Sequence, residues 1–125
     1  MLELGCGLGL PSLAAALRGA DVLGSDWADD AIELLRRNAE RNRVFLQVER
    51  VRWSEPERLL RAAPWDLVLG ADLLYEARNA EQLAELLPRI GGEVLLAEPG
   101  RPYAKEFLER FRAEPVGERI YRLAC

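Results

Sequence analysis

Short apolar runs alternate along the whole chain with segments of helical periodicity, and each pair occupies about 20 to 25 residues. The apolar runs predict strands at 1–4, 21–26, 66–71 and 93–97. The run at 67–69 is continuously apolar, which is typical of a central strand covered on both faces, and 93–97 has the same character. Residues 44–51 alternate between apolar and polar instead, so we expect that strand at an edge of the sheet. The pattern predicts βαβ units that build a parallel sheet.

Helices are predicted between these strands, at 11–18, 29–42, 55–62, 79–87 and 103–112. Pro11 suits a first helical position, because its missing N–H would have no partner there. The helix at 11–18 is apolar nearly all round, so we expect it to be well buried. Pro88 and the glycine pair at 91–92 predict the end of the fourth helix. The tail at 114–125 predicts a hairpin of short strands that turns near Gly117.

Composition limits the classes of function. The chain has 125 residues, 50% hydrophobic and 30% charged, which is enough for one domain with one core. It has no histidine, which excludes Ser-His-Asp and Cys-His catalysis and histidine-ligated zinc. Cys6 and Cys125 are too few for a disulfide framework or a four-cysteine zinc site. They predict reduced thiols in a cytoplasmic protein.

Charge and hydropathy limit the partners. The net charge of −4 argues against a nucleic-acid partner, which usually selects a basic face. No segment has the roughly 20 consecutive apolar residues that cross a bilayer, and Glu3 interrupts an N-terminus that has no basic leader. We therefore expect a cytoplasmic protein with no metal ion, no membrane contact and no nucleic acid. No apolar stripe indicates a dimer interface, so we expect a monomer.

The strongest functional signal is a glycine-rich turn at 3–9, with the sequence ELGCGLG, between the first strand and the first helix. Glycines permit positive φ and bring a ligand close to the backbone N–H groups at a helix start. Leu10 stands where a dinucleotide fingerprint needs its third glycine, so the spacing is G-x-G-x-G. Glu3 makes the rim acidic, which suits a cationic or zwitterionic nucleoside better than a pyrophosphate. The alternative is a purely structural tight turn.

Two aspartates follow predicted strands. Asp26 ends the second strand, 17 residues after Gly9, where a carboxylate can accept two hydrogen bonds from a ribose diol. The alternative for Asp26 is an ordinary helix-capping residue. Asp72 follows the buried strand at 66–71. Because ligands of such sheets bind beyond the carboxyl ends of the strands, the glycine turn and both aspartates should meet in one crevice.

The segment LELGCGLGLPSLAAA, followed by Asp26, resembles the seven-stranded S-adenosylmethionine-dependent methyltransferases. It is most similar to their family 16 type, which includes many protein lysine methyltransferases, and the resemblance covers essentially the whole chain. It implies a Rossmann-like, doubly wound α/β fold with helices on both faces of a mostly parallel sheet in the order 3-2-1-4-5-7-6. It also implies S-adenosylmethionine as the cofactor, with its methionine end at Glu3 and its ribose hydroxyls at Asp26. The backbone that would run beneath the cofactor includes Gly5, Cys6, Gly7 and Gly9.

A second motif, residues 71–75 with the sequence ADLLY, matches the family's D-x-x-Y signature, which lines the methyl acceptor site. The resemblance implies that Asp72 and Tyr75 are the catalytic and substrate-binding residues and that Ala71 borders the cofactor. Asp72 would hold the incoming ammonium or its emerging charge, and Tyr75 would shape the acceptor channel. In the alternative interpretation Asp72 caps the following helix and Tyr75 packs beneath it.

Two tryptophans lie where the cofactor's adenine is expected. Trp53 follows the third strand at a position where the family places a tryptophan beside the adenine, although Arg52 replaces the aspartate that often precedes it. Trp27, next to Asp26, would cover the adenine face. Simple packing is the alternative for both tryptophans.

A loop after the strand at 93–97, with the sequence EPGR at 98–101, is similar to the D-P-G-R segment of one branch of the family. That branch methylates the β-subunit of electron transfer flavoprotein. Glu98 would then form a wall of the acceptor site and attract a basic substrate. The alternative is a simple turn with proline and glycine in turn positions.

Family members carry further residues ahead of the glycine motif, including a helix and loop that close over the cofactor. We therefore expect residues 1–125 to be one S-adenosylmethionine-binding domain, N-terminally truncated and without this lid. The favoured function is N-methylation of a lysine in a protein substrate. The alternatives are a methyltransferase for a small amine or another small molecule, and a truncated, non-catalytic binding or partner module. An NAD-dependent oxidoreductase is the least favoured, because of Leu10.

Overall fold

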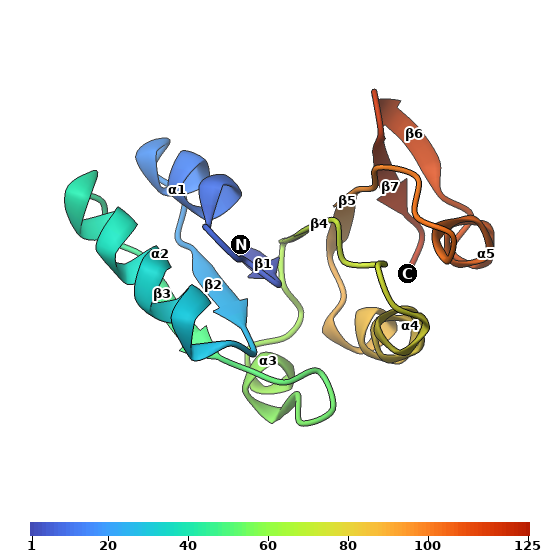
Figure 1. Cartoon of the computed structure of the whole chain (residues 1–125), viewed down its shortest axis with the longest axis horizontal. Coiled ribbons are helices and arrows are strands. Elements are labelled where there is room, and N and C mark those ends of the chain that lie inside the picture. Colours follow the sequence, from blue (N-terminus) through green and yellow to red (C-terminus); the bar gives the residue numbers. More distant parts are fainter.

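The computed structural model describes residues 1–125 and shows a seven-stranded sheet with helices on both faces (Figure 1). The strands are β1 (Leu2–Leu4), β2 (Leu23–Asp26), β3 (Gln47–Arg50), β4 (Leu67–Ala71), β5 (Glu93–Ala97), β6 (Glu114–Gly117) and β7 (Ile120–Leu123). The helices are α1 (Leu10–Leu17), α2 (Asp29–Arg41), α3 (Glu57–Arg61), α4 (Ala77–Ile90) and α5 (Ala104–Arg110). No helix is both long enough and apolar enough to cross a membrane.

The strands follow the order β3-β2-β1-β4-β5-β7-β6, as the resemblance implied. The five strands from β3 to β5 are parallel, and β7 then runs antiparallel to both β5 and β6. β3 lies at the sheet edge, as its alternating pattern predicted, and the final hairpin turns directly after Gly117. Strands β2 and β3 are added on one side of β1, and β4 and the later strands are added on its other side, so the order of strands switches direction between β1 and β4. This switch point is where a ligand crevice is expected in a doubly wound sheet.

Two hydrophobic cores fill the spaces between the helices and the sheet. The larger contains 19 buried residues and lies against α3, α4 and α5 on one face. The smaller lies under α1 and α2 on the other face (Figure 1). It contains Cys6, Leu13, Ile32, Leu35, Ala39 and Val48. Each core removes apolar surface from water, so the two together hold both helical layers against the sheet.

The face of the sheet that carries α1 and α2 is covered less completely than the sequence predicted. Leu13 of α1 is buried, but Leu10 and Leu17 are 66% and 61% exposed. The prediction of a well-buried first helix is therefore wrong, because only one side of α1 rests on the sheet. Leu69 of β4 and Leu95 of β5 point to this same face and are only half-buried. The prediction that these central strands are covered on both faces is therefore wrong for the face that carries α1 and α2.

Pro88 does not end α4, as the sequence predicted, but lies within it. The helix continues to Ile90, which is fully buried, and Gly91 follows as its C-cap. Pro88 removes one backbone N–H from the last turn, so a single helical hydrogen bond is lost. Burial of Leu87 and Ile90 in the larger core offsets that loss.

Candidate active site

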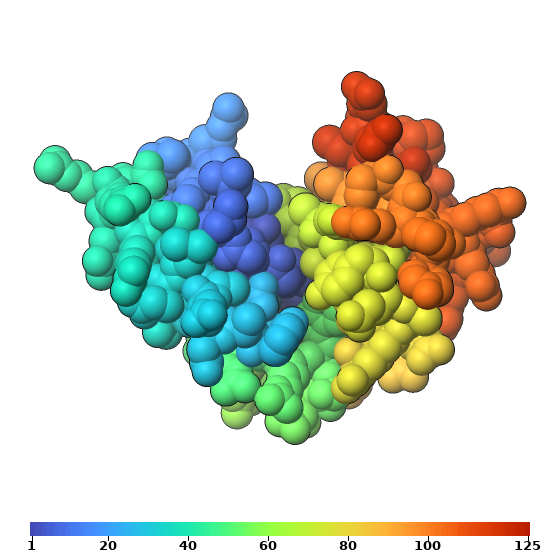
Figure 2. Space-filling view, viewed as in Figure 1, coloured from blue at the N-terminus to red at the C-terminus, as the bar shows by residue number.

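A cavity of about 420 Å³ opens at the carboxyl ends of the strands, between the residues after β2 and β3 and the start of α4. Figure 2 shows the surface hollowed between the blue and cyan N-terminal part of the chain and the yellow part. Seven of the residues predicted from sequence line this cavity: Gly5, Asp26, Trp27, Trp53, Ala71, Asp72 and Tyr75. The other five predicted residues, Glu3, Cys6, Gly7, Gly9 and Glu98, lie outside the lining. The cavity therefore brings together both aspartates and both tryptophans of the expected site.

The glycine-rich turn is tied to the end of β2 by Asp26. Asp26 Oδ2 accepts a hydrogen bond of 3.0 Å from the backbone N–H of Gly7, and Oδ1 accepts one of 3.0 Å from the N–H of Ala28. Gly5 adopts a φ of +58°, and a Cβ there would approach Leu73 Cδ2 to 2.5 Å. Both the backbone conformation and the nearby Leu73 methyl group therefore favour glycine at this position. Asp26 fixes the turn while it faces the cavity.

Two residues of the glycine-rich turn, Glu3 and Cys6, are titratable and buried. Glu3 is 2% exposed, and its Oε1 accepts hydrogen bonds from Ser12 Oγ at 2.6 Å and from the Ser12 N–H at 3.1 Å. Burial raises the pKa of Glu3, although the Ser12 hydrogen bonds oppose that shift. Burial, followed by the nearby carboxylates of Asp26 and Glu3, raises the pKa of the Cys6 thiol to about 12. Cys6 is therefore a protonated, unreactive thiol at neutral pH.

Trp27 and Trp53 both face the cavity but differ in exposure. Trp27 is 61% exposed, and Arg50 Nε donates a 2.9 Å hydrogen bond to its carbonyl oxygen. Trp53 is half-buried and packs against the larger core, with Arg52 beside it in the cavity lining. Packing against the larger core thus explains the buried part of the Trp53 side chain, whereas most of the Trp27 side chain is exposed.

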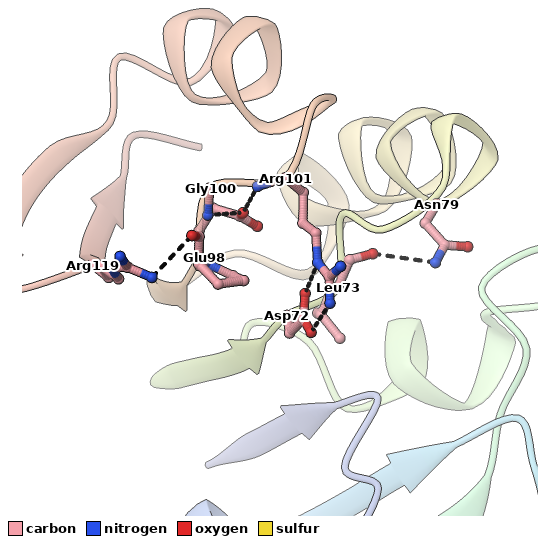
Figure 3. A network of polar contacts seen from close by, with 8 residues as sticks. Asp72, Leu73, Asn79, Glu98, Gly100, Arg101 and Arg119 are labelled. Carbon is pink, nitrogen blue, oxygen red and sulfur yellow. Dashed lines mark hydrogen bonds and ion pairs between the residues drawn. The ribbon is translucent and has the colours of Figure 1, made fainter.

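Asp72 forms a two-pronged ion pair with an arginine for which the sequence predicted no role (Figure 3). Arg101 Nε donates to Asp72 Oδ1 at 2.8 Å, and Nη2 donates to Oδ2 at 2.7 Å. The hydrogen-bonded guanidinium holds the pKa of Asp72 below its ordinary range, so this carboxylate is ionised at neutral pH. Asp72 itself has a φ of +53°, and its N–H donates to the Ala97 carbonyl at 2.9 Å. Tyr75, 48% exposed, lies in the same cavity lining.

Glu98 lies behind this ion pair and is 3% exposed. Its Oε1 accepts hydrogen bonds from the N–H groups of Gly100 at 2.8 Å and of Arg101 at 2.6 Å, as Figure 3 shows. Its Oε2 is buried without a hydrogen-bond partner. In this structure Glu98 organises the turn at 98–101, and its contact with a methyl acceptor stays a prediction.

Several residues that line the cavity were not predicted from the sequence to take part in the site: Val51, Ser54, Glu76, Arg78, Asn79 and Gln82. Asn79 and Gln82 are three positions apart and share one face of α4, a spacing that could have marked them once Tyr75 was placed before the helix. Asn79 Nδ2 also donates to the Leu73 carbonyl at 3.2 Å, which ties α4 to the loop after β4. Asp72 and Arg101 carry opposite charges and follow two neighbouring strands, β4 and β5, so their ion pair could have been predicted once the strand order was known. No group of three or more His, Cys, Asp or Glu side chains is arranged to hold a metal ion.

Residues 1–111 match the protein family described as lysine methyltransferase. The electron transfer flavoprotein beta subunit lysine methyltransferase of Xenopus laevis is 33% identical, and the match covers 99% of this chain and 48% of that protein. The protein N-lysine methyltransferase METTL21A of Danio rerio is 33% identical, across 91% of this chain and 54% of that protein. The chain thus spans about half the length of the curated relatives it matches.

A solved structure shows the same fold. The Pyrococcus abyssi tRNA (uracil-54, C5)-methyltransferase in complex with S-adenosyl-L-homocysteine superposes with a TM-score of 0.73 and 19% identity, across 98% of this chain and 33% of that one. The Rossmann-like α/β fold inferred from the glycine motif is therefore confirmed. Because the family match covers nearly the whole chain and two relatives reach 33% identity, the chain belongs to the lysine methyltransferase family.

Proposed function

We propose that residues 1–125 form an S-adenosylmethionine-binding domain that transfers a methyl group to a lysine side chain of a protein substrate. The observation that carries this proposal is that Asp26 and Asp72 line one cavity, at the ends of β2 and β4. A nucleoside held at Asp26 and a cation held at Asp72 would share that space. Membership of the lysine methyltransferase family and the names of the two relatives support a protein lysine as the acceptor.

The residues present fit the cofactor. Each carboxylate oxygen of Asp26 accepts one backbone hydrogen bond and can accept a second, as a ribose diol requires. Trp27 and Trp53 offer aromatic surface for an adenine, and a cavity of about 420 Å³ is of the usual size for a small-molecule site. Glu3 Oε1 is taken by Ser12, so the expected contact with the methionine end would use Oε2, which accepts no hydrogen bond within the chain.

The chemistry asks the chain mainly to position the acceptor. When bound, S-adenosylmethionine supplies a methyl group that is already activated on a sulfonium. The acceptor nitrogen would have to lose a proton to water and be held in the cavity as a neutral amine. Transfer would leave the positive charge on that nitrogen, in the cavity that Asp72 lines. Asp72 is ionised and would stabilise that charge on nitrogen, and Tyr75 would border the acceptor channel.

Transfer of tritiated methyl from S-adenosylmethionine to a cell extract tests the proposal. We expect label in protein, on lysine after acid hydrolysis. Label confined to small molecules would contradict the protein acceptor and favour a small-amine methyltransferase. Binding of S-adenosylhomocysteine without transfer to any fraction would instead support a non-catalytic module.

Asp72→Asn tests the residue that would hold the acceptor. We expect it to abolish transfer and to leave S-adenosylhomocysteine affinity in a calorimetric titration unchanged. Asp66→Asn is the matched control, because Asp66 is an exposed carboxylate at the other end of the same strand, β4. Full transfer by Asp72→Asn would remove Asp72 from the proposed mechanism.

We further infer a monomeric cytoplasmic protein. Both cysteines are free, as is usual in a reducing compartment. Light scattering on the eluting peak of a sizing column measures the mass, and fluorescence microscopy of a tagged chain measures the location.

A further inference from the structure

Arg101 occupies the carboxylate that the proposed mechanism needs for the acceptor. Its guanidinium meets Asp72 in a fork of two parallel hydrogen bonds, 2.8 Å and 2.7 Å long. A fork of this kind uses both carboxylate oxygens and places a full positive charge against them. An alkylammonium has the same charge and also donates N–H groups to oxygen. The guanidinium therefore presents to Asp72 the same chemistry as the acceptor side chain.

The turn that carries Arg101 is anchored from the interior. Glu98 Oε1 accepts from the N–H groups of both Gly100 and Arg101, and Glu98 is 3% exposed. Gly100 has a φ of +106° with no atom within 4 Å of a would-be Cβ, so the backbone conformation rather than a steric contact calls for glycine. Figure 3 shows Arg101 reaching from this turn to Asp72. The anchored backbone directs the side chain to Asp72, so the pair is built into the fold.

The ion pair is nevertheless open to exchange. The Asp72 and Arg101 side chains are 44% and 45% exposed. Exposed pairs in water are held only weakly, because water and salt compete for both charges. An incoming cation can therefore replace the guanidinium without leaving a buried charge unpaired.

We propose that Arg101 is an internal competitor of the acceptor: the acceptor ammonium binds Asp72 only by displacing the Arg101 guanidinium. The proposal rests on the proposed function, because it takes Asp72 as the residue that holds the acceptor. Glu98 acts through Arg101 as a positioning residue, since it holds the turn from which the guanidinium reaches the site. The competition lowers the affinity of Asp72 for every cation, so an acceptor needs further contacts in the cavity to bind.

A titration with n-butylammonium, which has the length and charge of a lysine side chain, tests the competition without any methyl transfer. The chain is saturated with S-adenosylhomocysteine, and the arginine Nε–H signals are followed by NMR. The Arg101 signal is identified by its absence in Arg101→Gln. We expect this signal to shift as n-butylammonium binds, and we expect Arg101→Gln to bind it about two- to fivefold more tightly, the range typical of removing an exposed ion pair.

Arg122→Gln is the matched control. Arg122 Nε pairs with Glu93 at 2.9 Å, and the two side chains are 50% and 46% exposed, but neither residue lines the cavity. We expect this variant to bind n-butylammonium as the wild type does, since it changes the net charge by the same amount.

Equal or weaker binding by Arg101→Gln, or an Arg101 signal that does not move while the amine binds, would overturn the competition. Absence of amine binding in Arg101→Gln would overturn it as well. These outcomes are distinct from failure of the proposed function. That failure would be seen in the tritium experiment, where wild-type chain would label no protein, whatever the amine titration shows.

Discussion

The Asp26 carboxylate and the Gly7 N–H, 19 positions apart in the chain, are joined by a hydrogen bond of 3.0 Å. This bond closes the glycine-rich turn against the end of β2. It leaves Asp26 facing the cavity while the same carboxylate also accepts from Ala28 at the start of α2. The alternative of a helix-capping role for Asp26 is wrong, because the N-cap of α2 is Ala28 and no side chain caps that helix, while Asp26 accepts only from the N–H of Ala28 itself. One side chain orders the turn and remains available to a ligand.

Asp26→Ala should weaken binding of S-adenosylhomocysteine at least about tenfold, because the proposed ribose contact and the bond that orders the turn would both be lost. Calorimetric titration measures the affinity directly. The control is Asp29→Ala, which removes a neighbouring carboxylate that is 79% exposed and lies 3.6 Å from Arg50. Unchanged affinity in Asp26→Ala would move the cofactor away from the end of β2.

Gly9 and Gly19 have similar left-handed backbones, with φ of +78° and +86°, but different surroundings. A Cβ at Gly9 would collide with Leu35, which is fully buried, whereas a Cβ at Gly19 would meet nothing within 4 Å. Gly19→Ala should cost about 1–2 kcal/mol of the free energy of unfolding through backbone strain alone. Gly9→Ala should cost about 1–3 kcal/mol more through overpacking. Urea unfolding measures both, and equal losses would show that Leu35 can give way.

The sheet order followed from the family resemblance, whereas seven of the 15 residues that line the cavity could be predicted because their signals are local in sequence. The G-x-G-x-G turn, Asp26 and Asp72 each directly follow a strand. Once the strand order is given, the carboxyl ends of parallel strands must meet at one edge of the sheet. The same logic placed Trp27 beside the cavity, since it follows Asp26 directly.

The features that could not be predicted depend on tertiary packing. An apolar helix such as α1 indicates burial, but the extent of burial depends on how many elements pack around it. Leu10 and Leu17 remain exposed because nothing packs on that side. The direction of the Glu98 carboxylate follows from the backbone of one turn, in which Gly100 has positive φ. The amino-acid composition does not indicate that backbone conformation, so only the structure shows that Glu98 accepts hydrogen bonds from the N–H groups of Gly100 and Arg101.

The two cysteines should differ sharply in reactivity toward iodoacetamide at about pH 8, because only the thiolate is alkylated. Cys6 is 5% exposed, and burial raises its pKa to about 12; partial burial also raises the pKa of Cys125, but that residue is exposed at the chain end and accessible to the reagent. Intact mass measurement should find a single adduct on the folded chain and a second after denaturation. Cys125→Ser, the control, should acquire none while folded. Alkylation of Cys6 in the folded chain as rapid as that of Cys125 would show that the turn opens readily.

Glu3 should make the stability of the fold depend on pH. Its carboxylate is 2% exposed, and burial raises its pKa above the ordinary value of 4.5. Between that value and the folded pKa, the native chain binds more protons at Glu3 than the unfolded chain does. The contribution of Glu3 to stability is therefore fully present below 4.5 and is lost as the pH rises through the folded pKa.

Glu3→Gln isolates this contribution, because glutamine keeps an oxygen that can accept from Ser12 but carries no charge. We expect the free energy of unfolding of Glu3→Gln, relative to wild type, to grow as the pH rises through the window above 4.5 and then to level off. Urea unfolding at a series of pH values from about 4 to 8 measures that difference. Glu40→Gln, which removes an exposed carboxylate of α2, supplies the baseline for the loss of one charge. A difference between Glu3→Gln and wild type that stays constant or shrinks with rising pH would mean that the protonated form of Glu3 is not favoured by folding. In that case the Ser12 hydrogen bonds, which favour the charged form, outweigh the desolvation of the carboxylate.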